Sequence, residues 1–387
     1  MLVTAPRVVP AVAGSKPLEP GYVVTEDRRI TDVGQGTPPR APDHELLTGV
    51  LVPGLVDLQV NGYFGIDLAE ADPAGWAQVV QRLPETGVTA FQPTFITAPV
   101  GDLAKALRRT AEFVPYLPAG ARILGVHLEG PFISPLRAGA HRREWMVPPT
   151  PQAIAMLLEA GGGLVRLVTL APEVDGGLEA VAALVREGVT VSVGHSDATA
   201  VQVAAAAAAG ARMVTHLFNA QRPLHQREPG VVGQALVDRR LTCGLIVDLR
   251  HVVAAACEIA FAAAPGRICL VTDAAASAGM PPGRYVLGGE PVELPPGDTA
   301  APLRDDGTLA GSALRMDRAI ANAVAVGLGL NEAVAAATRI PADLIGRPDL
   351  GRLAPGATVD LTWLSDDLRT LATWVGGEQA YAGAAGS

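Results

Sequence analysis

The chain has 387 residues, of which 49% are hydrophobic, and a formal net charge of -9 at pH 7. This length accommodates one large domain with an appendage, or two domains, and this hydrophobic content excludes global disorder. The acidic balance excludes a basic surface that would attract nucleic acid, so an anionic small molecule would have to be held by individual arginines.

The cysteine pattern and the apolar runs indicate a cytoplasmic protein without a membrane segment. The three cysteines are Cys243, Cys257 and Cys269. They lie far apart in apolar runs, which is typical of reduced, buried thiols rather than of a disulfide framework or a cysteine-zinc site. Residues 1–16 lack the charged leader and long apolar core of a signal peptide. The alanine-rich runs at 203–210 and 252–265 are too short to span a bilayer.

The chain begins with a few short strands over residues 1–49, and residues 51–60 then form a buried strand. From there strand-like and helix-like segments alternate, which indicates βα units and a parallel sheet. The predicted strands are 51–60, 88–96, 122–129, 164–170, 190–195, 212–216, 241–248 and 267–273, and the helices between them include 102–113, 152–159, 178–186, 200–209 and 252–263. Eight such units favour an α/β fold of the (β/α)₈ barrel type. A doubly wound open sheet is the alternative.

The pattern changes after residue 274. Residues 285–298 predict a polar hairpin insert, and the segments 314–326 and 331–338 are again helical. Residues 359–364 and 373–381 have β character. We therefore expect the two chain ends, 1–52 and 346–387, to form one small β-sandwich domain, with the barrel over 53–345.

Four of the predicted strands end on a polar side chain: Glu129, His195, His216 and Asp273. The carboxyl ends of barrel strands lie at one rim, so these side chains should meet there. Each alone has an ordinary explanation, such as capping a helix or, for Glu129, pairing with Arg137. Together they indicate a metal site with a carboxylate beside it, because a buried carboxylate needs a cation and three ligands with one open position are typical of catalytic metal sites.

Eight short motifs support a family resemblance. They are PGLVDLQVNG (53–62), HLEGPF (127–132), GAH (139–141), GHS (194–196), THLFNA (215–220), REPG (227–230), TDA (272–274) and LAGS (309–312). In this order and at these separations, the chain resembles the N-acetylglucosamine-6-phosphate deacetylases of the amidohydrolase superfamily over nearly its whole length. The resemblance implies a metal-dependent hydrolase barrel with a split β domain. It also implies deacetylation of N-acetylglucosamine 6-phosphate to glucosamine 6-phosphate and acetate, a reaction of amino-sugar metabolism.

The resemblance also implies roles for individual residues. Glu129, His195 and His216 would bind one divalent metal ion, with zinc preferred and iron, manganese or cobalt as alternatives. Asp273 would be the catalytic carboxylate, which takes a proton from water and returns it to the leaving amine. His141 would contact the substrate and help to polarise the acetyl carbonyl.

The substrate's phosphate and sugar would be held by a second group of residues. They are Asn219, Ala220, Arg227 and His251. Arg227 offers a donor fork for phosphate, to which the backbone N–H groups of Asn219 and Ala220 could add. In family members this arginine can reach the neighbouring subunit's site, so the resemblance implies a homodimer.

Several positions depart from wider patterns. Many superfamily members carry a second metal site on the first strand, where this chain has Gln59 and Asn61. Amides are poor ligands for transition metals, so these are vestigial second-metal positions and a single ion is expected. Leu249, Gln221 and Arg222 also differ from the family pattern, which bears on the loops around His251 and Arg227.

Two alternatives remain at this point: another hydrolase of the superfamily, acting on cyclic amides or N-acyl amino acids, and a non-catalytic homologue of the barrel. Arg227 with Asn219 and Ala220 favours a phosphorylated substrate over the first. The retention of all four strand-end residues argues against the second.

Overall fold

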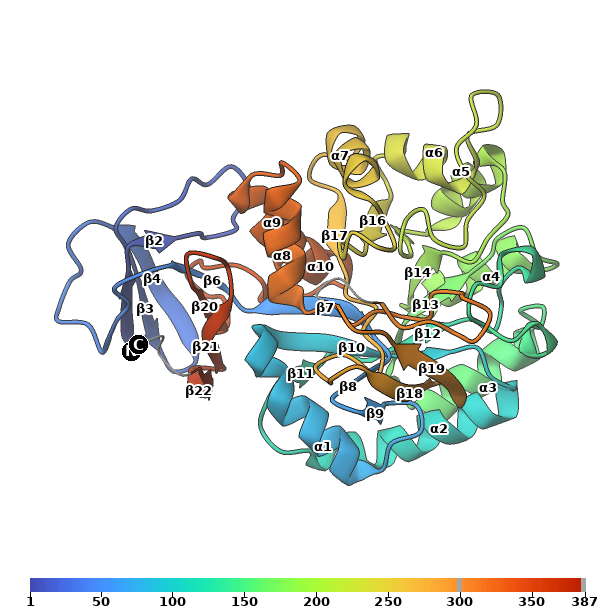
Figure 1. Ribbon diagram of the computed structural model, residues 1–387, viewed down its shortest axis with the longest axis horizontal. Helices are drawn as coiled ribbons and strands as arrows, with labels where there is room; N and C mark the ends of the chain where they lie inside the picture. Colours follow the sequence, from blue (N-terminus) through green and yellow to red (C-terminus); the bar gives the residue numbers. More distant parts are fainter. Residues whose placement is uncertain (298–300, 384–387) are drawn as a thin grey trace.

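The computed structural model describes residues 1–297 and 301–383, and a ring of parallel strands lies at its centre (Figure 1). Around the ring the strands are β7 (Leu55–Val60), β10 (Val88–Ile96), β12 (Val126–Glu129), β13 (Val165–Leu170), β14 (Thr190–Val193), β15 (Met213–Val214), β16 (Thr242–Leu245) and β17 (Ile268–Leu270). The short strand β11 (Arg122–Ile123) also pairs with β10. Between β17 and β7, the Asp273 N–H donates to the Gln59 carbonyl at 2.9 Å, and a parallel bridge joins Val60 to Ala274. The eight strands thus form a nearly closed barrel, so the (β/α)₈ prediction is confirmed and the open sheet is wrong.

Helices cover the outside of this ring. They are α1 (Pro73–Arg82), α2 (Val100–Phe113), α3 (Pro151–Gly161), α4 (Gly177–Arg186), α5 (Ala200–Ala209), α6 (Gly230–Val237), α7 (Ala254–Ala263), α8 (Met316–Ala325), α9 (Leu330–Ala336) and α10 (Arg339–Leu344), with 3₁₀ turns η1 (Leu83–Thr86), η2 (Val114–Tyr116), η3 (Pro135–Arg137) and η4 (Arg143–Trp145). Local sequence sets where several begin: Asp72 and Thr150 accept N-cap hydrogen bonds, and Thr199 forms a capping box with Gln202. Among the described residues, none of these helices has the length and hydropathy needed to cross a bilayer.

Strand β7 explains why the barrel strands read as continuous apolar runs. All six of its residues are buried, because a parallel strand is covered by side chains on one face and by helices on the other. The polar residues Asp57 and Gln59 interrupt it, and both are buried in the barrel.

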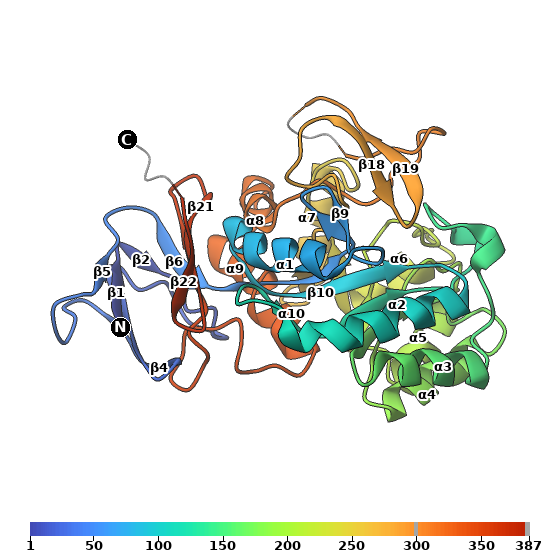
Figure 2. The ribbon, with the colours of Figure 1, turned by 90° about the horizontal axis from the view of Figure 1, so that it is seen from below.

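Two small hairpins lie beside the carboxyl ends of the strands. The predicted insert is confirmed as β18 (Gly283–Leu287) and β19 (Glu290–Leu294), although Asp298, its predicted end, lies outside the described residues. Leu287 and Val292 pack with Ala275 and Ala310 in a separate apolar cluster, which holds the hairpin against the barrel (Figure 2). The other hairpin is β8 (Gly62–Tyr63) with β9 (Ile66–Asp67).

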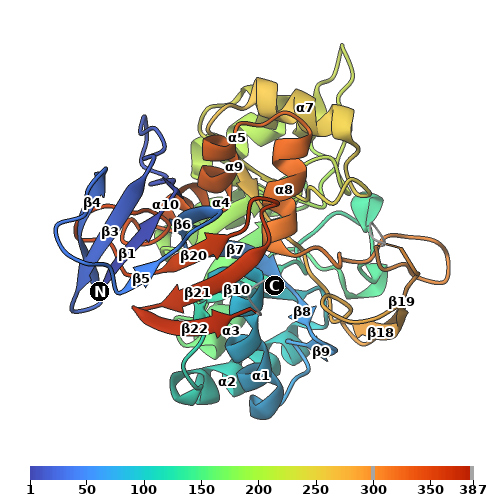
Figure 3. The same ribbon diagram turned by 60° about the vertical axis from the view of Figure 1, so that its left-hand side comes forward.

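The two chain ends meet in a second unit, called here the two-sheet unit (Figure 3). Its four-stranded sheet has the order β4 (Arg29–Gln35), β3 (Gly21–Glu26), β1 (Leu2–Ala5) and β5 (His44–Glu45). Its five-stranded sheet has the order β2 (Arg7–Val8), β6 (Val50–Pro53), β20 (Leu361–Leu364), β21 (Thr370–Val375) and β22 (Glu378–Ala382). Val3 and Val23 of the first sheet share a buried cluster with Leu361 and Trp374 of the second.

Strand β6 connects this unit to the barrel. Its side chains alternate, so Leu51 belongs to the core of the two-sheet unit while Val50 and Val52 belong to the core of the barrel. One face of the five-stranded sheet therefore packs on the barrel. The exact boundaries, 1–52 with 346–387 against 53–345, stay a prediction, and residues 384–387 lie outside the described part of the chain.

Candidate metal centre and active site

The polar strand-end residues meet at one rim of the barrel. Glu129 is the last residue of β12, and His195, His216 and Asp273 follow β14, β15 and β17 within three residues. The last three have φ angles of 47°, 25° and 51°, in the left-handed region. Strained backbone of this kind persists only where the surrounding structure enforces it, and it is typical of active sites.

Three of these side chains converge on a common point. Glu129 Oε1 lies 2.8 Å from His216 Nε2 and 3.1 Å from His195 Nε2, and the two imidazole nitrogens are 3.1 Å apart. In a tetrahedral zinc site with bonds of about 2.0 Å, neighbouring ligand atoms are about 3.3 Å apart. All three side chains are buried. The donor set, one carboxylate and two imidazoles, and its spacing therefore fit a divalent metal ion.

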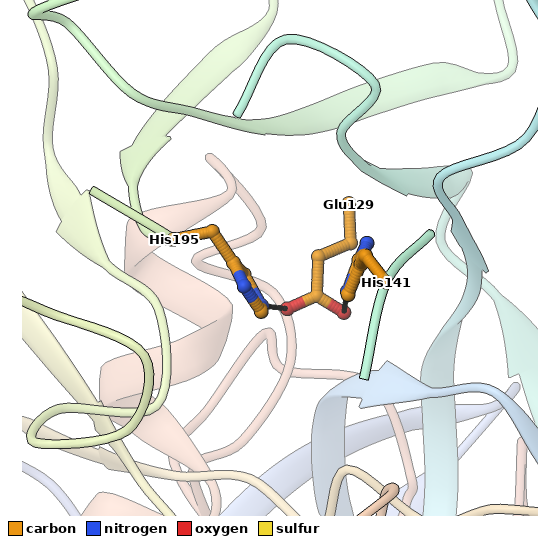
Figure 4. Close-up of side chains that lie close together, drawn as sticks. All are labelled: Glu129, His141 and His195. Atoms are coloured by element: carbon orange, nitrogen blue, oxygen red, sulfur yellow. Dashed lines mark hydrogen bonds and ion pairs between the residues drawn. The ribbon is translucent and has the colours of Figure 1, made fainter. Parts of the chain in front are cut away.

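His141 approaches the same carboxylate from the other side. Its Nε2 lies 3.9 Å from Glu129 Oε2, and Figure 4 shows Glu129 between His195 and His141. The ligand atoms of these three residues lie within 4.8 Å of one another, so they form a second possible triple. The set with His216 is tighter, since its three donor atoms lie within 3.1 Å of one another. His141 is held by Thr97, whose hydroxyl lies 2.7 Å from Nδ1.

The two histidines of the tighter set are oriented differently. His195 Nδ1 lies 3.0 Å from the carbonyl of Arg137, to which it donates, so its Nε2 carries the free lone pair that faces the centre. His216 Nδ1 is buried and has no hydrogen-bond partner among the described residues.

Asp273 lies beside this centre and is bonded to two amides of the first strand. Gln59 Nε2 donates to Glu129 Oε1 at 3.2 Å and to Asp273 Oδ1 at 3.0 Å, and Asn61 Nδ2 donates to Asp273 Oδ1 at 2.7 Å. The two amides of the first strand, Gln59 and Asn61, therefore supply N–H donors to both carboxylates.

The surroundings drive the pKa values of the two carboxyl groups apart. Burial alone would raise the pKa of Glu129, but the neighbouring His195 and His216 side chains hold it well below its usual range. Burial, followed by the charge of Glu129, raises the pKa of Asp273 to about 6. One carboxylate is thus fixed as an anion, and the other can exchange a proton near neutral pH, which is the pattern expected of an acid–base site.

A cavity of about 210 Å³ opens over these groups. Of the predicted substrate-binding residues, His141, Asn219, Ala220 and His251 line it. Arg227 does not line it: this residue is exposed on the loop before α6.

The position of His251 resolves the effect of Leu249. Leu249 adopts a φ of 62°, a left-handed conformation that favours glycine, so the backbone of this loop is strained. The Asp248 carboxylate lies 2.6 Å from His251 Nδ1 and orients the ring, which reaches the cavity.

Sequence reasoning missed part of the cavity wall. Leu287 comes from the hairpin insert, Thr308 from the segment after it, and Ile96 from the end of β10. No residue type or spacing marks them, because apolar residues at strand ends, such as Leu287 and Ile96, are normally core, and a threonine in a loop is ordinary. Thr97, which holds His141, carries an equally ordinary signal.

Comparison with known proteins identifies the family of this chain. The model of the Amidohydrolase family matches residues 50–381. The chain belongs to the amidohydrolase family.

This amidohydrolase is a hydrolase, and its relatives are amino-sugar phosphate deacetylases. The N-acetylglucosamine-6-phosphate deacetylase of Bos taurus is 37% identical over 385 residues, covering 96% of this chain and 90% of the relative. An N-acetylgalactosamine-6-phosphate deacetylase of Escherichia coli O157:H7 is also 37% identical, with 86% and 88% covered. The crystal structure of N-acetyl-D-glucosamine-6-phosphate deacetylase from Mycobacterium smegmatis has a TM-score of 0.91 at 39% identity, covering 98% of this chain and 99% of that one. An enamidase, at 15% identity and a TM-score of 0.62, shares the fold alone.

Proposed function

We propose that this amidohydrolase removes the acetyl group of N-acetylglucosamine 6-phosphate, giving glucosamine 6-phosphate and acetate. The observation that carries the proposal is the convergence of Glu129, His195 and His216 within 3.1 Å at the floor of a cavity beside Asp273. The names of the relatives support the substrate class. One equally similar relative is named for the galactosamine epimer, so the choice at the sugar's C4 is part of the test.

We assign Glu129, His195 and His216 as ligands of one divalent ion, with zinc preferred and iron, manganese or cobalt able to use the same donors. When bound, such an ion lowers the pKa of a water molecule and polarises the acetyl carbonyl. The N–H donors of Gln59 and Asn61 favour a single ion, because they offer no anionic ligand for a second one.

Asp273 would act as the base and then as the acid. Its carboxylate accepts a proton from the attacking water while the carbonyl carbon gains a bond to the water oxygen. The C–N bond then breaks, and the amine leaves with the proton that Asp273 returns. The hydrogen bonds from Gln59 and Asn61 hold one oxygen of Asp273, which leaves the other free for the proton.

His141 would bind the acetyl oxygen. Burial lowers the pKa of His141 well below its usual value, so the ring is neutral. The Thr97 N–H and hydroxyl lie 3.4 and 2.7 Å from Nδ1, and in the tautomer with its hydrogen on Nε2 the ring can donate from the nitrogen on the Glu129 side. A neutral donor at this place can stabilise the negative charge that develops on the acetyl oxygen.

The phosphate would be held by the Asn219 and Ala220 backbone and by Arg227 of a second copy of the chain, while His251 would contact the sugar hydroxyls. The described residues that line the cavity include no lysine or arginine, whereas a phosphate calls for a cation. Arg227 is exposed and lies outside its own cavity, which suits an arginine that completes the site of a partner in a homodimer. We infer a cytoplasmic location as well, supported by three buried free cysteines.

The experiment is an assay of acetate release from the 6-phosphates of N-acetylglucosamine, N-acetylgalactosamine and N-acetylmannosamine, and from unphosphorylated N-acetylglucosamine, with metal analysis of the same sample. We expect the first compound to be the best substrate and one metal ion per chain. Equal hydrolysis of the unphosphorylated sugar would contradict the phosphate site, and a metal-free active sample would contradict the metal site.

The partner's arginine is tested by mixing two variants with different defects. Arg227→Ala should raise KM about 10- to 100-fold with little change in kcat, since a charge-assisted hydrogen bond is lost from binding. Asp273→Asn lacks the base but can still supply Arg227. Mixed dimers of the two variants should therefore regain a low KM in the Arg227→Ala subunit. If mixing restores nothing, each Arg227 serves its own site or none; Arg239→Ala, an exposed arginine elsewhere, is the matched control.

A further inference from the structure

The segment after β15 is an unusually strained turn. Three non-glycine residues within five positions have left-handed φ angles: 25° at His216, 81° at Phe218 and 49° at Ala220. Each such conformation is unfavourable and must be held by its surroundings. The turn carries one proposed metal ligand, His216, and the backbone proposed for phosphate at Asn219 and Ala220.

The side chain of Gln221 bridges this turn from inside. It is only 3% exposed, its Nε2 donates to the Thr215 carbonyl at 2.6 Å, and its Oε1 accepts from the Phe218 N–H at 3.1 Å. One amide thus satisfies the backbone acceptor just before His216 and a backbone donor just after it. Because both partners flank His216 closely, the bridge fixes the direction in which the His216 side chain leaves the backbone.

His216 needs this support more than His195 does. The ring of His195 is oriented by its own hydrogen bond from Nδ1 to the Arg137 carbonyl at 3.0 Å. Among the described residues, Nδ1 of His216 has no such partner. Metal-binding histidines are normally oriented by a bond from the second ring nitrogen. For His216 the orientation therefore depends on the backbone that carries it.

The backbone of Gln221 and its neighbours also ties the turn to the loop after His195. The Ser196 N–H donates to the Ala220 carbonyl at 3.2 Å, and the Arg222 N–H donates to the Ser196 carbonyl at 2.9 Å. A parallel bridge joins Ser196 to Gln221. These hydrogen bonds at Gln221 thus fix the loop after β14, which carries His195, relative to the loop after β15, which carries His216.

We propose that Gln221 is a positioning residue, which fixes His216 for metal binding and sets the Asn219–Ala220 backbone for the phosphate. This inference rests on the proposed function, because it takes His216 as a metal ligand. Gln221 itself touches neither metal nor substrate; it acts through the turn.

The test is Gln221→Met, which keeps the length and volume of the side chain but removes both hydrogen bonds. We expect the dissociation constant for zinc, measured by competition with a chelator, to rise 10- to 100-fold, the usual effect of losing a group that orients a ligand. In the zinc-saturated enzyme, KM for N-acetylglucosamine 6-phosphate should also rise. A buried glutamine on β10, which is not adjacent to β15 in the barrel, supplies the matched control: Gln92 is fully buried, and among the described residues its side chain makes one long hydrogen bond, 3.5 Å to the Leu124 carbonyl. Gln92→Met should leave the zinc constant unchanged.

A zinc constant of Gln221→Met equal to that of the native protein overturns the proposal, and so does an equal increase in Gln92→Met. If Gln221→Met does not fold, Gln221→Glu serves instead, since its carboxylate keeps the acceptor for Phe218 and removes the donor to Thr215. It too should weaken zinc binding. The variant His216→Ala distinguishes a failure of this inference from a failure of the proposed metal site. If His216→Ala binds zinc as the native chain does, the proposed metal site is wrong. If His216→Ala loses zinc but Gln221→Met binds it normally, only the role of Gln221 is refuted.

Discussion

The barrel rim and the two-sheet unit both contain left-handed non-glycine residues, but in different surroundings. At the rim these residues include His195, His216 and Asp273, all less than 9% exposed. In the two-sheet unit Asp27 and Arg28 are exposed in the tight turn between β3 and β4. The same backbone strain therefore aims buried polar side chains at the rim, whereas in the unit it only reverses the chain.

The barrel rim and the two-sheet unit also differ in where their charged side chains lie. The rim buries Glu129 and Asp273 among histidines and amides. In the two-sheet unit the ion pair between Arg28 and Glu378 is at the surface, with side chains that are 74% and 70% exposed. Substitutions at the rim should therefore reduce metal binding and catalysis, and substitutions in the unit should reduce stability alone.

The largest effect is expected for Glu129→Gln. The amide keeps the shape of the side chain but removes the anion between His195 and His216, and amides are poor ligands for transition metals. Metal content should fall, and kcat/KM should drop by about 10³-fold or more, since several kcal/mol of transition-state stabilisation go with the ion. Elemental analysis and a rate measurement on one sample decide it. Glu378→Gln, on the surface of the unit, is the control, and full metal content in Glu129→Gln would remove this residue from the ligand set.

Asp273→Asn tests the other carboxylate of the rim. The asparagine oxygen can still accept the hydrogen bonds from Gln59 and Asn61, so zinc binding should persist. The kcat should fall about 10²- to 10⁴-fold, because the proton acceptor is lost. Undiminished turnover with bound zinc would exclude Asp273 as the base.

Trp374→Ala tests the two-sheet unit. Trp374 is 2% exposed and packs edge to face on His44, with ring centroids 5.4 Å apart. Removing a buried indole should lower the free energy of unfolding by about 3–5 kcal/mol. The kcat/KM per folded molecule at 25 °C should not change. A large catalytic defect in a folded sample would show that the unit and the rim are coupled, against the comparison above.

The parts of this molecule that the sequence predicts are those fixed by local pattern. Continuous apolar runs gave the eight barrel strands, because a parallel strand is covered on both faces, and the rule that strand ends share one rim brought Glu129, His195 and Asp273 together. The features that the sequence did not predict depend on where the loops lie in space. Leu287 reaches the cavity only because the hairpin insert packs against the barrel, and the exposure of Arg227 depends on the path of its loop.

The contacts of Gln221 are another feature that the sequence could not predict. The sequence marks it only as a departure from the family pattern, since one glutamine carries no periodicity and no spacing. Its contacts with Thr215 and Phe218 exist because three nearby residues adopt left-handed conformations, which cannot be read from apolar patterning.

The smallest effect, and the finest test of the comparison, is expected for Arg28→Gly. Asp27 and Arg28 form a two-residue hairpin turn with φ angles of 45° and 63°, a type I′ geometry that favours Asp-Gly. Glycine removes a left-handed strain of about 1–2 kcal/mol, against about 0.5–1 kcal/mol of extra chain entropy in the unfolded state, and the exposed pair with Glu378 contributes little. The free energy of unfolding should rise by about 0.5 kcal/mol, visible in urea unfolding.

The variant Leu249→Gly at the rim relieves the same kind of strain. Leu249 packs against the barrel core, however, so the loss of its contacts should cancel the gain in the free energy of unfolding. If the free energy of unfolding rises equally in both variants, the strained backbone at Leu249 depends on packing no more than the strained backbone at Arg28 does.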